Sequence, residues 1–364
     1  MKPQRFYLPE LDLLRFGAFL LVFLCHTITP AMQAGPHGHL LVAIKTAGAL
    51  GVPVFFFLSA YLITQLLVIE KNRTGLINIR SFYVRRILRI WPLYFGFLGA
   101  IYLIGFVVSA FHFPTAGLPY YLLLSGNWWK GPSSFAAPLW SISVEEQFYL
   151  LWPTLAKWFT IRGLAMVSVG FWCVSQIALL FLSQWHLPIG TYIWPNSFVQ
   201  LQFFALGGLA AIILRGRRPR LSPLSRASLV TAGIVSFFAA EYFYSAVVPD
   251  TLALPFMTVP GFLLIGLGVV LLFLGTLGIT VPSLAMPLVY FGKISYGLYV
   301  FHLVVLNTVI SIVAHIHLQH TYYLLDWIFA LPLTILTAHL SYLFFESRFL
   351  LLKERFTVVE NRAV

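Results

Sequence analysis

About ten stretches of this chain are apolar over the roughly 20 residues that a helix needs to cross the hydrocarbon of a bilayer. They lie near residues 11–29, 47–69, 90–108, 139–159, 164–182, 198–214, 228–247, 256–279, 286–314 and 323–345. Because 60% of the residues are hydrophobic and only 9% are charged, little of the chain remains for a soluble domain. We therefore predict an all-α integral membrane protein, a bundle of about ten transmembrane helices.

The distribution of basic residues predicts the direction in which the chain crosses the membrane. The 23 Lys and Arg outnumber the 11 Asp and Glu and give a net charge of +12. When the apolar stretches cross alternately, nearly all basic residues fall on one side, which is cytoplasmic by the positive-inside rule. We expect both termini to be cytoplasmic and the protein to be multi-pass in the cytoplasmic (inner) cell membrane. The basic loop 215–226 is expected to face anionic headgroups, and nucleic acid is not an expected partner.

Charged or polar side chains within an apolar stretch are candidates for function, since each charge costs about 3 kcal/mol on insertion scales. Arg15 and His26 are eleven positions apart, which places them on the same face of a helix. His26 would lie toward the outer side of the membrane. The alternative is that Arg15 only pairs with Asp12 one turn away and that His26 hydrogen-bonds a neighbouring helix.

A second group of polar residues begins the stretch at 139–159. Ser141 and Glu145 share a helix face, and Glu145 is expected at a depth similar to that of His26. A carboxylate near an imidazole fixes its tautomer and stabilises its protonated form, as a general base requires. The alternative is that acids are simply favoured at a helix N-terminus by the macrodipole.

Three further patterns have both a functional and a structural interpretation. Ser59 in an apolar stretch either packs or donates one hydrogen bond. Tyr299 and His302, with Ser295, form a polar stripe that lines a cavity or joins helices. Arginines 85, 86 and 89 either bind phosphates, for which the guanidinium fork is suited, or form a headgroup belt. The two cysteines, at positions 25 and 173, lie in apolar stretches and predict neither a disulfide framework nor a metal site.

Taken together, these segments resemble acyltransferase family 3, the multi-span O-acyltransferases that modify extracytoplasmic hydroxyls. The resemblance covers nearly the whole chain. It rests on residues 8–15 leading to His26, the segment 51–63, the Arg86-x-x-Arg89 pair, Trp140-Ser-Ile-Ser-Val-Glu145, and the segment 294–302 ending at His302. Two small departures are Ala60, where glycine is usual, and Ile142, where leucine is common.

The resemblance implies a fold and a reaction. Residues 1–346 would form a single transmembrane acyltransferase domain and residues 347–364 a short basic cytoplasmic tail, without the fused SGNH hydrolase-like domain of some relatives. The donor would be a cytoplasmic acyl-CoA, usually acetyl-CoA, with no permanently bound cofactor. The acceptor would be an extracytoplasmic hydroxyl, such as that of a surface or lipid-linked polysaccharide. The oligomeric state is open.

The resemblance also implies roles for individual residues. His26 would be the general base, steered by Glu145. The expected donor-binding residues are Arg15, Arg85, Arg86, Arg89 and Ser59, and the expected acceptor or pocket residues are Ser141, Tyr299 and His302. Alternatives are a covalent route through Cys25 or His26 itself, and a transporter or flippase for a lipid-linked sugar or anionic solute. A purely structural membrane anchor would leave Arg15, His26 and Glu145 unexplained.

Overall fold

The computed structural model describes residues 7–27, 38–131, 135–247, 251–315 and 326–357, most of them in helices. Within these ranges, β-structure is limited to one isolated bridge between Pro188 and Leu252. Eight helical segments of the described chain are long and apolar enough to cross a membrane. The prediction of an all-α integral membrane protein is confirmed, while the count of about ten spans stays a prediction.

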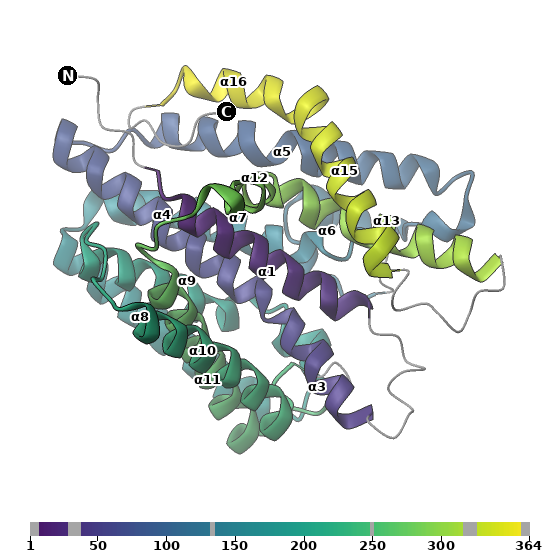
Figure 1. Ribbon diagram of the computed structural model, residues 1–364, viewed down its shortest axis with the longest axis horizontal. Coiled ribbons are helices and arrows are strands. Elements are labelled where there is room, and N and C mark those ends of the chain that lie inside the picture. The colour runs from purple at the N-terminus through teal and green to yellow at the C-terminus, as the bar shows by residue number, and fades with distance from the viewer. Residues whose placement is uncertain (1–6, 28–37, 132–134, 248–250, 316–325, 358–364) are drawn as a thin grey trace. The chain divides into compact units, whose positions relative to one another are not determined.

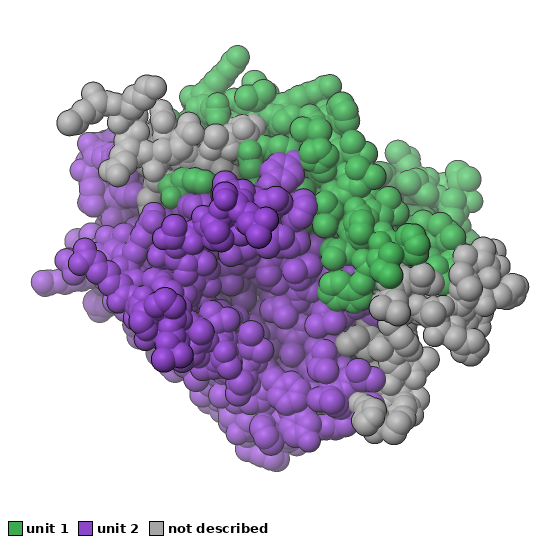
Figure 2. Space-filling model, in the orientation of Figure 1, with its two compact units in different colours: residues 1–7, 78–146, 293–364 green, residues 8–77, 147–292 purple. Residues whose placement is uncertain are grey.

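The described residues form two compact units, which Figure 2 shows in different colours. Unit 1 draws on residues 78–146 and on the chain from residue 293 onward. Unit 2 draws on residues 8–77 and 147–292. Helix α7 (Leu139–Trp158) contributes its first residues to unit 1 and the remainder to unit 2.

The helices of each unit are labelled in Figure 1. Those of unit 2 are α1 (Pro9–Thr27), α3 (Gly38–Ala49), α4 (Gly51–Thr74), α8 (Ile161–Gln184), η4 (Ile189–Ile193), α9 (Ser197–Leu214), α10 (Pro223–Tyr244), α11 (Pro255–Thr276), η5 (Ser283–Ala285) and α12 (Met286–Lys293, up to residue 292). Those of unit 1 are α5 (Ile79–Ile104), η1 (Ser109–Phe111), η2 (Thr115–Gly117), α6 (Leu118–Leu122), η3 (Gly126–Trp128), α13 (Ser295–His315), η7 (Asp326–Ala330), α15 (Leu331–Ser341), η8 (Tyr342–Glu346) and α16 (Ser347–Glu354).

Polar side chains define where several of these helices begin. Asn78, Thr160, Asn196 and Ser222 each accept a hydrogen bond from a backbone N–H in the first turn of α5, α8, α9 and α10. The cap at Asn78 explains why α5 begins eleven residues before the predicted apolar stretch and includes the arginines at 80, 85, 86 and 89. Residues 347–354, which the sequence assigned to a basic tail, form α16.

Glycines allow α1 to pack directly against α3 and α4 in unit 2. A Cβ atom at Gly51 would overlap the Ala18 carbonyl oxygen, and one at Gly48 would overlap that of Leu21. Small residues at helix crossings let backbones approach closely, which is how apolar helices gain packing energy where lipid is as apolar as the partner helix. These two glycines therefore fix how α1 packs against the helices that follow it.

The core of unit 2 contains stacked aromatic rings that join α4, α7 and α9. The ring centroids of Phe148 and Phe204 are 4.4 Å apart, and those of Phe56 and Phe204 are 4.7 Å apart. Trp152, which is fully buried, donates its indole N–H to the Thr64 hydroxyl at 2.9 Å. The indole nitrogen is thus satisfied inside an apolar core, as its burial requires.

In unit 1, α5 packs against α13 and α16. The Tyr296 hydroxyl donates to the Ile90 carbonyl at 2.8 Å, and the rings of Phe97 and Phe301 meet edge to face at 5.7 Å. At the N-terminal part of α5, Arg85 donates to the Phe356 carbonyl at 2.6 Å, just beyond α16. Lys353 of α16 lies within electrostatic reach of the arginines of α5.

The ends of helices in unit 2 are joined by a lysine. Lys71 near the end of α4 donates to the carbonyls of Ala156, Lys157 and Phe159 at 3.0, 2.9 and 2.8 Å. These carbonyls belong to the end of α7, where backbone acceptors lack partners within the helix and the macrodipole favours a cation. Lys71 therefore caps a helix other than its own.

The glycine packing leads to a first prediction. Replacing Gly51 by alanine should destabilise the protein by about 1–3 kcal/mol, because the new methyl group overlaps the backbone of α1. The matched control is Gly17→Ala on α1, where a Cβ meets nothing within 4 Å. The measurement is the melting temperature of the purified protein in detergent. An equal or higher melting temperature for Gly51→Ala than for Gly17→Ala would contradict the packing.

The lysine cap leads to a second prediction. Replacing Lys71 by methionine keeps most of the side-chain volume but removes three charge-assisted hydrogen bonds, so we expect a loss of about 1–3 kcal/mol. Arg73→Gln removes one positive charge from an exposed position of the same helix end and should change stability by less than about 0.5 kcal/mol. Chemical unfolding of both variants in the same detergent distinguishes the cap from a general charge effect.

Candidate functional site

His26 lies in the last turn of α1, in unit 2, and is an exposed residue. Its Nδ1 atom is 2.9 Å from the Val22 carbonyl oxygen one turn earlier. Because a carbonyl oxygen only accepts, Nδ1 carries the hydrogen of this bond, and Nε2 of the neutral ring is left with the lone pair. The backbone of α1 thus sets the tautomer, a task that the sequence assigned to Glu145.

Two other residues of unit 2 lie near His26. Lys45 on α3 is within electrostatic reach of both His26 and Cys25. Cys25 itself packs against α3, since a Cβ built at Gly48 would lie 3.1 Å from the Cys25 Cβ. The sequence did not indicate Lys45 as a candidate, because nothing in its spacing relates it to α1.

The two other candidate residues of unit 2 both have hydrogen-bonding partners. Arg15 donates to the Asp12 carboxylate at 3.2 Å, the local pairing that was the structural alternative for this residue. Ser59 on α4 accepts a hydrogen bond from the Tyr149 hydroxyl at 3.1 Å. A role of either residue in donor binding stays a prediction.

Glu145 and the adjacent Glu146 belong to unit 1. The Trp91 indole N–H donates to Glu146 Oε2 at 3.0 Å, which joins α5 to α7. Glu145, Glu146 and Glu346 all lie within electrostatic reach of the half-buried Tyr296 on α13. Because His26 lies in unit 2, its pairing with Glu145 remains a prediction.

The predicted arginines of unit 1 lie near a buried lysine. Lys353 on α16 is within electrostatic reach of Arg85, Arg86 and Arg89. Arg86 also lies 5.5 Å from the centre of the Phe82 ring, a geometry that suits a cation–π contact. The three guanidinium groups repel one another and attract anions, and their forks match phosphate oxygens.

Two carboxylates offset part of the positive charge of this basic cluster. Arg86 is within electrostatic reach of Glu146, and Arg89 of Glu346. The Glu346 carboxylate also accepts a hydrogen bond from the Ser341 hydroxyl at 3.1 Å. These carboxylates can hold the guanidinium groups of the arginines in place before an anionic ligand arrives.

Ser141, Tyr299 and His302, the predicted acceptor or pocket residues, come together in unit 1. The Ser141 and Tyr299 hydroxyl oxygens are 2.7 Å apart, and the rings of Tyr299 and His302 are 5.6 Å apart between centroids. Ser141 also donates to the Pro138 carbonyl at 3.1 Å, which leaves Tyr299 as the donor in the Ser141–Tyr299 bond. His302 Nδ1 donates to the Tyr299 carbonyl at 2.6 Å.

Several residues near these groups were not predicted as part of a site. They are Lys45 in unit 2 and Trp91, Glu346 and Lys353 in unit 1. Trp91 stands two positions after Arg89, but residues two apart on a helix do not face each other, so the sequence did not indicate its bond to Glu146. Glu346 and Lys353 are far from the arginines in sequence, and only the packing of α16 on α5 brings them there.

Comparison with known proteins finds relatives over most of the chain. A Staphylococcus aureus (strain COL) protein provisionally named an O-acetyltransferase is 28% identical over 372 residues, covering 94% of this chain and 57% of the relative. The peptidoglycan O-acetyltransferase OatA of Listeria monocytogenes is 27% identical, covering 82% of this chain and 49% of the relative. The acyltransferase MdmB of Streptomyces mycarofaciens is 30% identical over 54% of this chain and 50% of the relative. No solved structure matches the chain.

The chain therefore spans only about half the length of the curated relatives that it matches. The profile of one protein family, described as an acyltransferase domain, matches residues 8–346. That match includes His26 at the end of α1, Glu145 near the start of α7, the Arg86 and Arg89 pair, and the polar stripe that ends at His302. The chain accordingly belongs to acyltransferase family 3.

Proposed function

We propose that this protein is a membrane O-acyltransferase that moves an acyl group, in the first instance acetyl, from a cytoplasmic acyl-CoA to a hydroxyl on the outer side of the membrane. The acceptor class is a surface or lipid-linked carbohydrate. Membership of acyltransferase family 3 and the names of the relatives support the reaction type. The direction of transfer follows from the distribution of basic residues.

The observation that carries this proposal is the hydrogen bond from His26 Nδ1 to the Val22 carbonyl. This bond leaves the lone pair on Nε2 of an exposed residue at the end of α1. An imidazole with one nitrogen fixed by the backbone and the other unprotonated is suited to act as a general base. Glu145 is proposed as the carboxylate that stabilises the protonated ring.

The proposed chemistry is a direct displacement. Nε2 of His26 removes the proton of the acceptor hydroxyl while the oxygen attacks the thioester carbonyl. The C–S bond then breaks, the new C–O bond remains as an ester, and the proton passes to the CoA thiolate. Lys45 is proposed to stabilise the negative charge that develops on the carbonyl oxygen, since a fixed cation acts strongly where water is scarce.

Residues of unit 1 are proposed to bind the donor and the acceptor. Arg85, Arg86 and Arg89, gathered around Lys353, would bind the phosphates of the donor. Ser141, Tyr299 and His302 would line the place of the acceptor, where their hydroxyl and imidazole groups match the hydrogen-bonding groups of a sugar. Arg15 and Ser59 are proposed to contact the donor on its way.

The base assignment predicts that His26→Ala abolishes transfer. The loss of a general base typically reduces a rate by about 10²–10⁴-fold. The measurement is mass spectrometry of ester-linked acetyl on surface glycans of cells that express each variant, with the amount of inserted protein checked by immunoblot. Acetylation at the wild-type level in His26→Ala cells would refute the assignment.

The matched control for this experiment is Cys25→Ala. Direct transfer predicts that this variant retains activity, whereas a covalent route through Cys25 predicts that it loses as much as His26→Ala. The same cells test the transporter alternative. A transporter would be expected to export acceptor in both variants without any change in ester content.

The donor site predicts a change in KM. Arg86→Gln and Arg89→Gln should each raise the KM for acetyl-CoA by about 10–100-fold, the effect of losing a charge-assisted contact with phosphate. Arg86→Lys should give a smaller increase, because lysine keeps the charge but loses the fork. Arg80→Gln, at an exposed position in the first turn of the same helix, is the control. An equal increase in all variants would indicate general surface charge instead of a site.

A further inference from the structure

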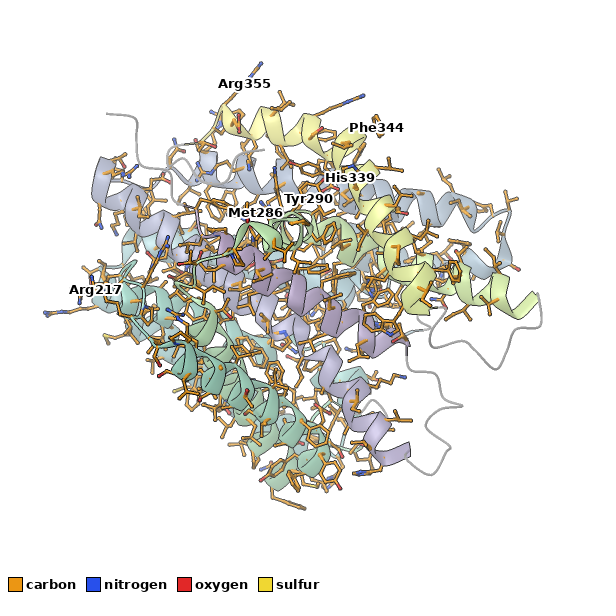
Figure 3. All side chains as sticks on the ribbon, viewed as in Figure 1. Arg217, Met286, Tyr290, His339, Phe344 and Arg355 are labelled. Carbon is orange, nitrogen blue, oxygen red and sulfur yellow. The ribbon has the colours of Figure 1, made fainter. Side chains whose placement is uncertain are left out.

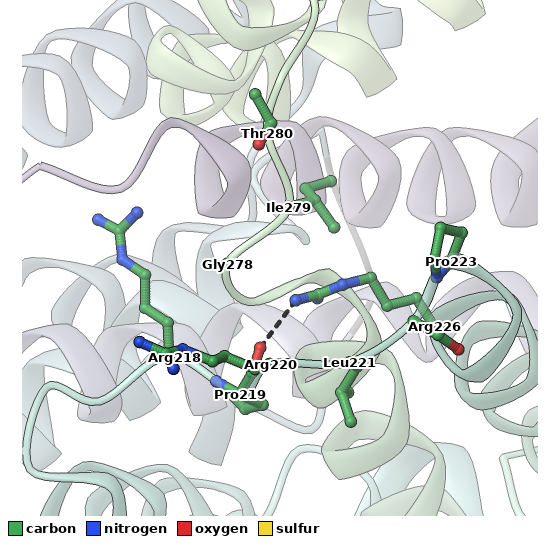
Figure 4. Close-up of a pocket in the computed structure, with 10 residues that line it drawn as sticks. Arg218, Pro219, Arg220, Leu221, Pro223, Arg226, Gly278, Ile279 and Thr280 are labelled. Carbon is green, nitrogen blue, oxygen red and sulfur yellow. Dashed lines mark hydrogen bonds between the residues drawn. The ribbon is translucent and has the colours of Figure 1, made fainter.

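Unit 2 contains an open pocket that the proposed function does not use. It has a volume of about 990 Å³ and lies where the connection from α9 to α10 meets the connection after α11. Three of its lining residues are arginines, at positions 218, 220 and 226, and none of its lining residues is acidic. Figure 4 shows Arg218 and Arg226 on either side of the connection that contains Gly278.

Arg226 holds the walls of the pocket in place. Its Nη1 donates to the carbonyls of Gly275 and Leu277 at 3.2 and 2.8 Å, and its Nη2 donates to the Pro219 carbonyl at 2.9 Å, the bond drawn in Figure 4. The Pro219 and Leu277 carbonyls belong to the two connections, and the Gly275 carbonyl belongs to the last turn of α11. The pocket is therefore pre-formed, because one side chain ties its two walls together.

Glu10 at the start of α1 holds the connection that contains Gly278, which forms one wall of the pocket. Its Oε1 accepts a hydrogen bond from the Gly278 N–H at 3.1 Å, and a φ of +82° at this position suits glycine. The same oxygen is 3.8 Å from Nη1 of Arg218, whose side chain is 52% exposed. At this distance and exposure the ion pair is weak, so Arg218 can exchange it for a ligand.

Arg220 makes no such contact. It is exposed, lines the pocket and makes no hydrogen bond or ion pair with any residue that the structure describes. Three guanidinium groups thus face this pocket with one carboxylate nearby, which leaves an excess of positive charge. A ligand that neutralises it must be an anion.

We infer that this pocket binds a phosphate group, with Arg218 and Arg220 as its ligands and Arg226 as the brace that keeps them in place. A phosphate offers several oxygens to two guanidinium forks, which a monodentate anion does not. The helices that meet here, α9, α10 and α11, are each long and apolar enough to cross a membrane, so the pocket lies at their ends, where headgroups and solutes are both within reach. The phosphate belongs either to a phospholipid headgroup or to a soluble nucleotide.

This inference does not depend on acyl transfer, and it differs from a general attraction of the loop to anionic lipid. General attraction depends on the number of charges in the loop, whereas a site depends on which arginines are removed. The loop offers a matched pair for this comparison. Arg215 and Arg217 are exposed and do not line the pocket, and Figure 3 shows Arg217 pointing away from the ribbon.

The test compares Arg218→Gln/Arg220→Gln with Arg215→Gln/Arg217→Gln in the full-length purified protein. Binding of phosphatidylglycerol and of adenosine 3′,5′-bisphosphate is measured by native mass spectrometry in detergent. We expect the pocket variant to lose at least about tenfold in affinity for one probe, as when one charge-assisted contact is removed, and the control variant to lose less than about threefold. The probe that responds identifies lipid or nucleotide as the source of the phosphate.

Arg220→Gln alone completes the design, because no described contact is lost with it and its fold should be unchanged. A fall in binding in this single variant at an unaltered melting temperature supports the site. Equal losses in the pocket and control variants, or no loss in either, would overturn the inference.

Discussion

The structure depends on one constraint: inside hydrocarbon, a polar group has no water to bond and must find a partner within the protein. Thr64 donates to the carbonyl one turn before it and accepts from Trp152, while Gln65 donates to the Ala211 carbonyl of another helix. Lys71 satisfies three carbonyls at the end of α7. Such contacts remove ordinary polar residues from consideration as functional groups. The charged residues that remain are few, which is why the candidate site can be defined at all.

Arginine has two different uses in the two units. In unit 1, arginines 85, 86 and 89 lie near Lys353, and the carboxylates of Glu146 and Glu346 offset the charges of Arg86 and Arg89. In unit 2, Arg226 is committed to three backbone carbonyls and has become part of the scaffold. The rigid planar fork explains both uses, since it can bind an anion or bridge several carbonyls in one plane. The number of arginines in a loop therefore does not indicate how many are available to a ligand.

Much of the fold could be predicted from the sequence, whereas the site could be predicted only in part. The apolar stretches each contain a helix in the described chain, with ends that differ because caps such as Asn78 lie outside the apolar region. Ser141 and Tyr299 were predicted as members of one pocket and share a hydrogen bond. Lys45 and Glu346 were missed, because each reaches its neighbours only through helix packing. The tautomer of His26 was assigned to Glu145, although a carbonyl in the preceding turn of α1 sets it.

The sequence by itself determined that this chain is an all-helical membrane protein with its basic residues predicted on one side. Hydropathy and charge are local properties that can be read along the chain. Only the tertiary structure decided which side chains meet: Lys71 with the end of α7, the cations of α5 with Lys353, and Arg226 with the walls of a pocket. These contacts depend on how each helix is rotated about its own axis. In helices that are apolar on nearly every face, periodicity carries too little information to fix that rotation.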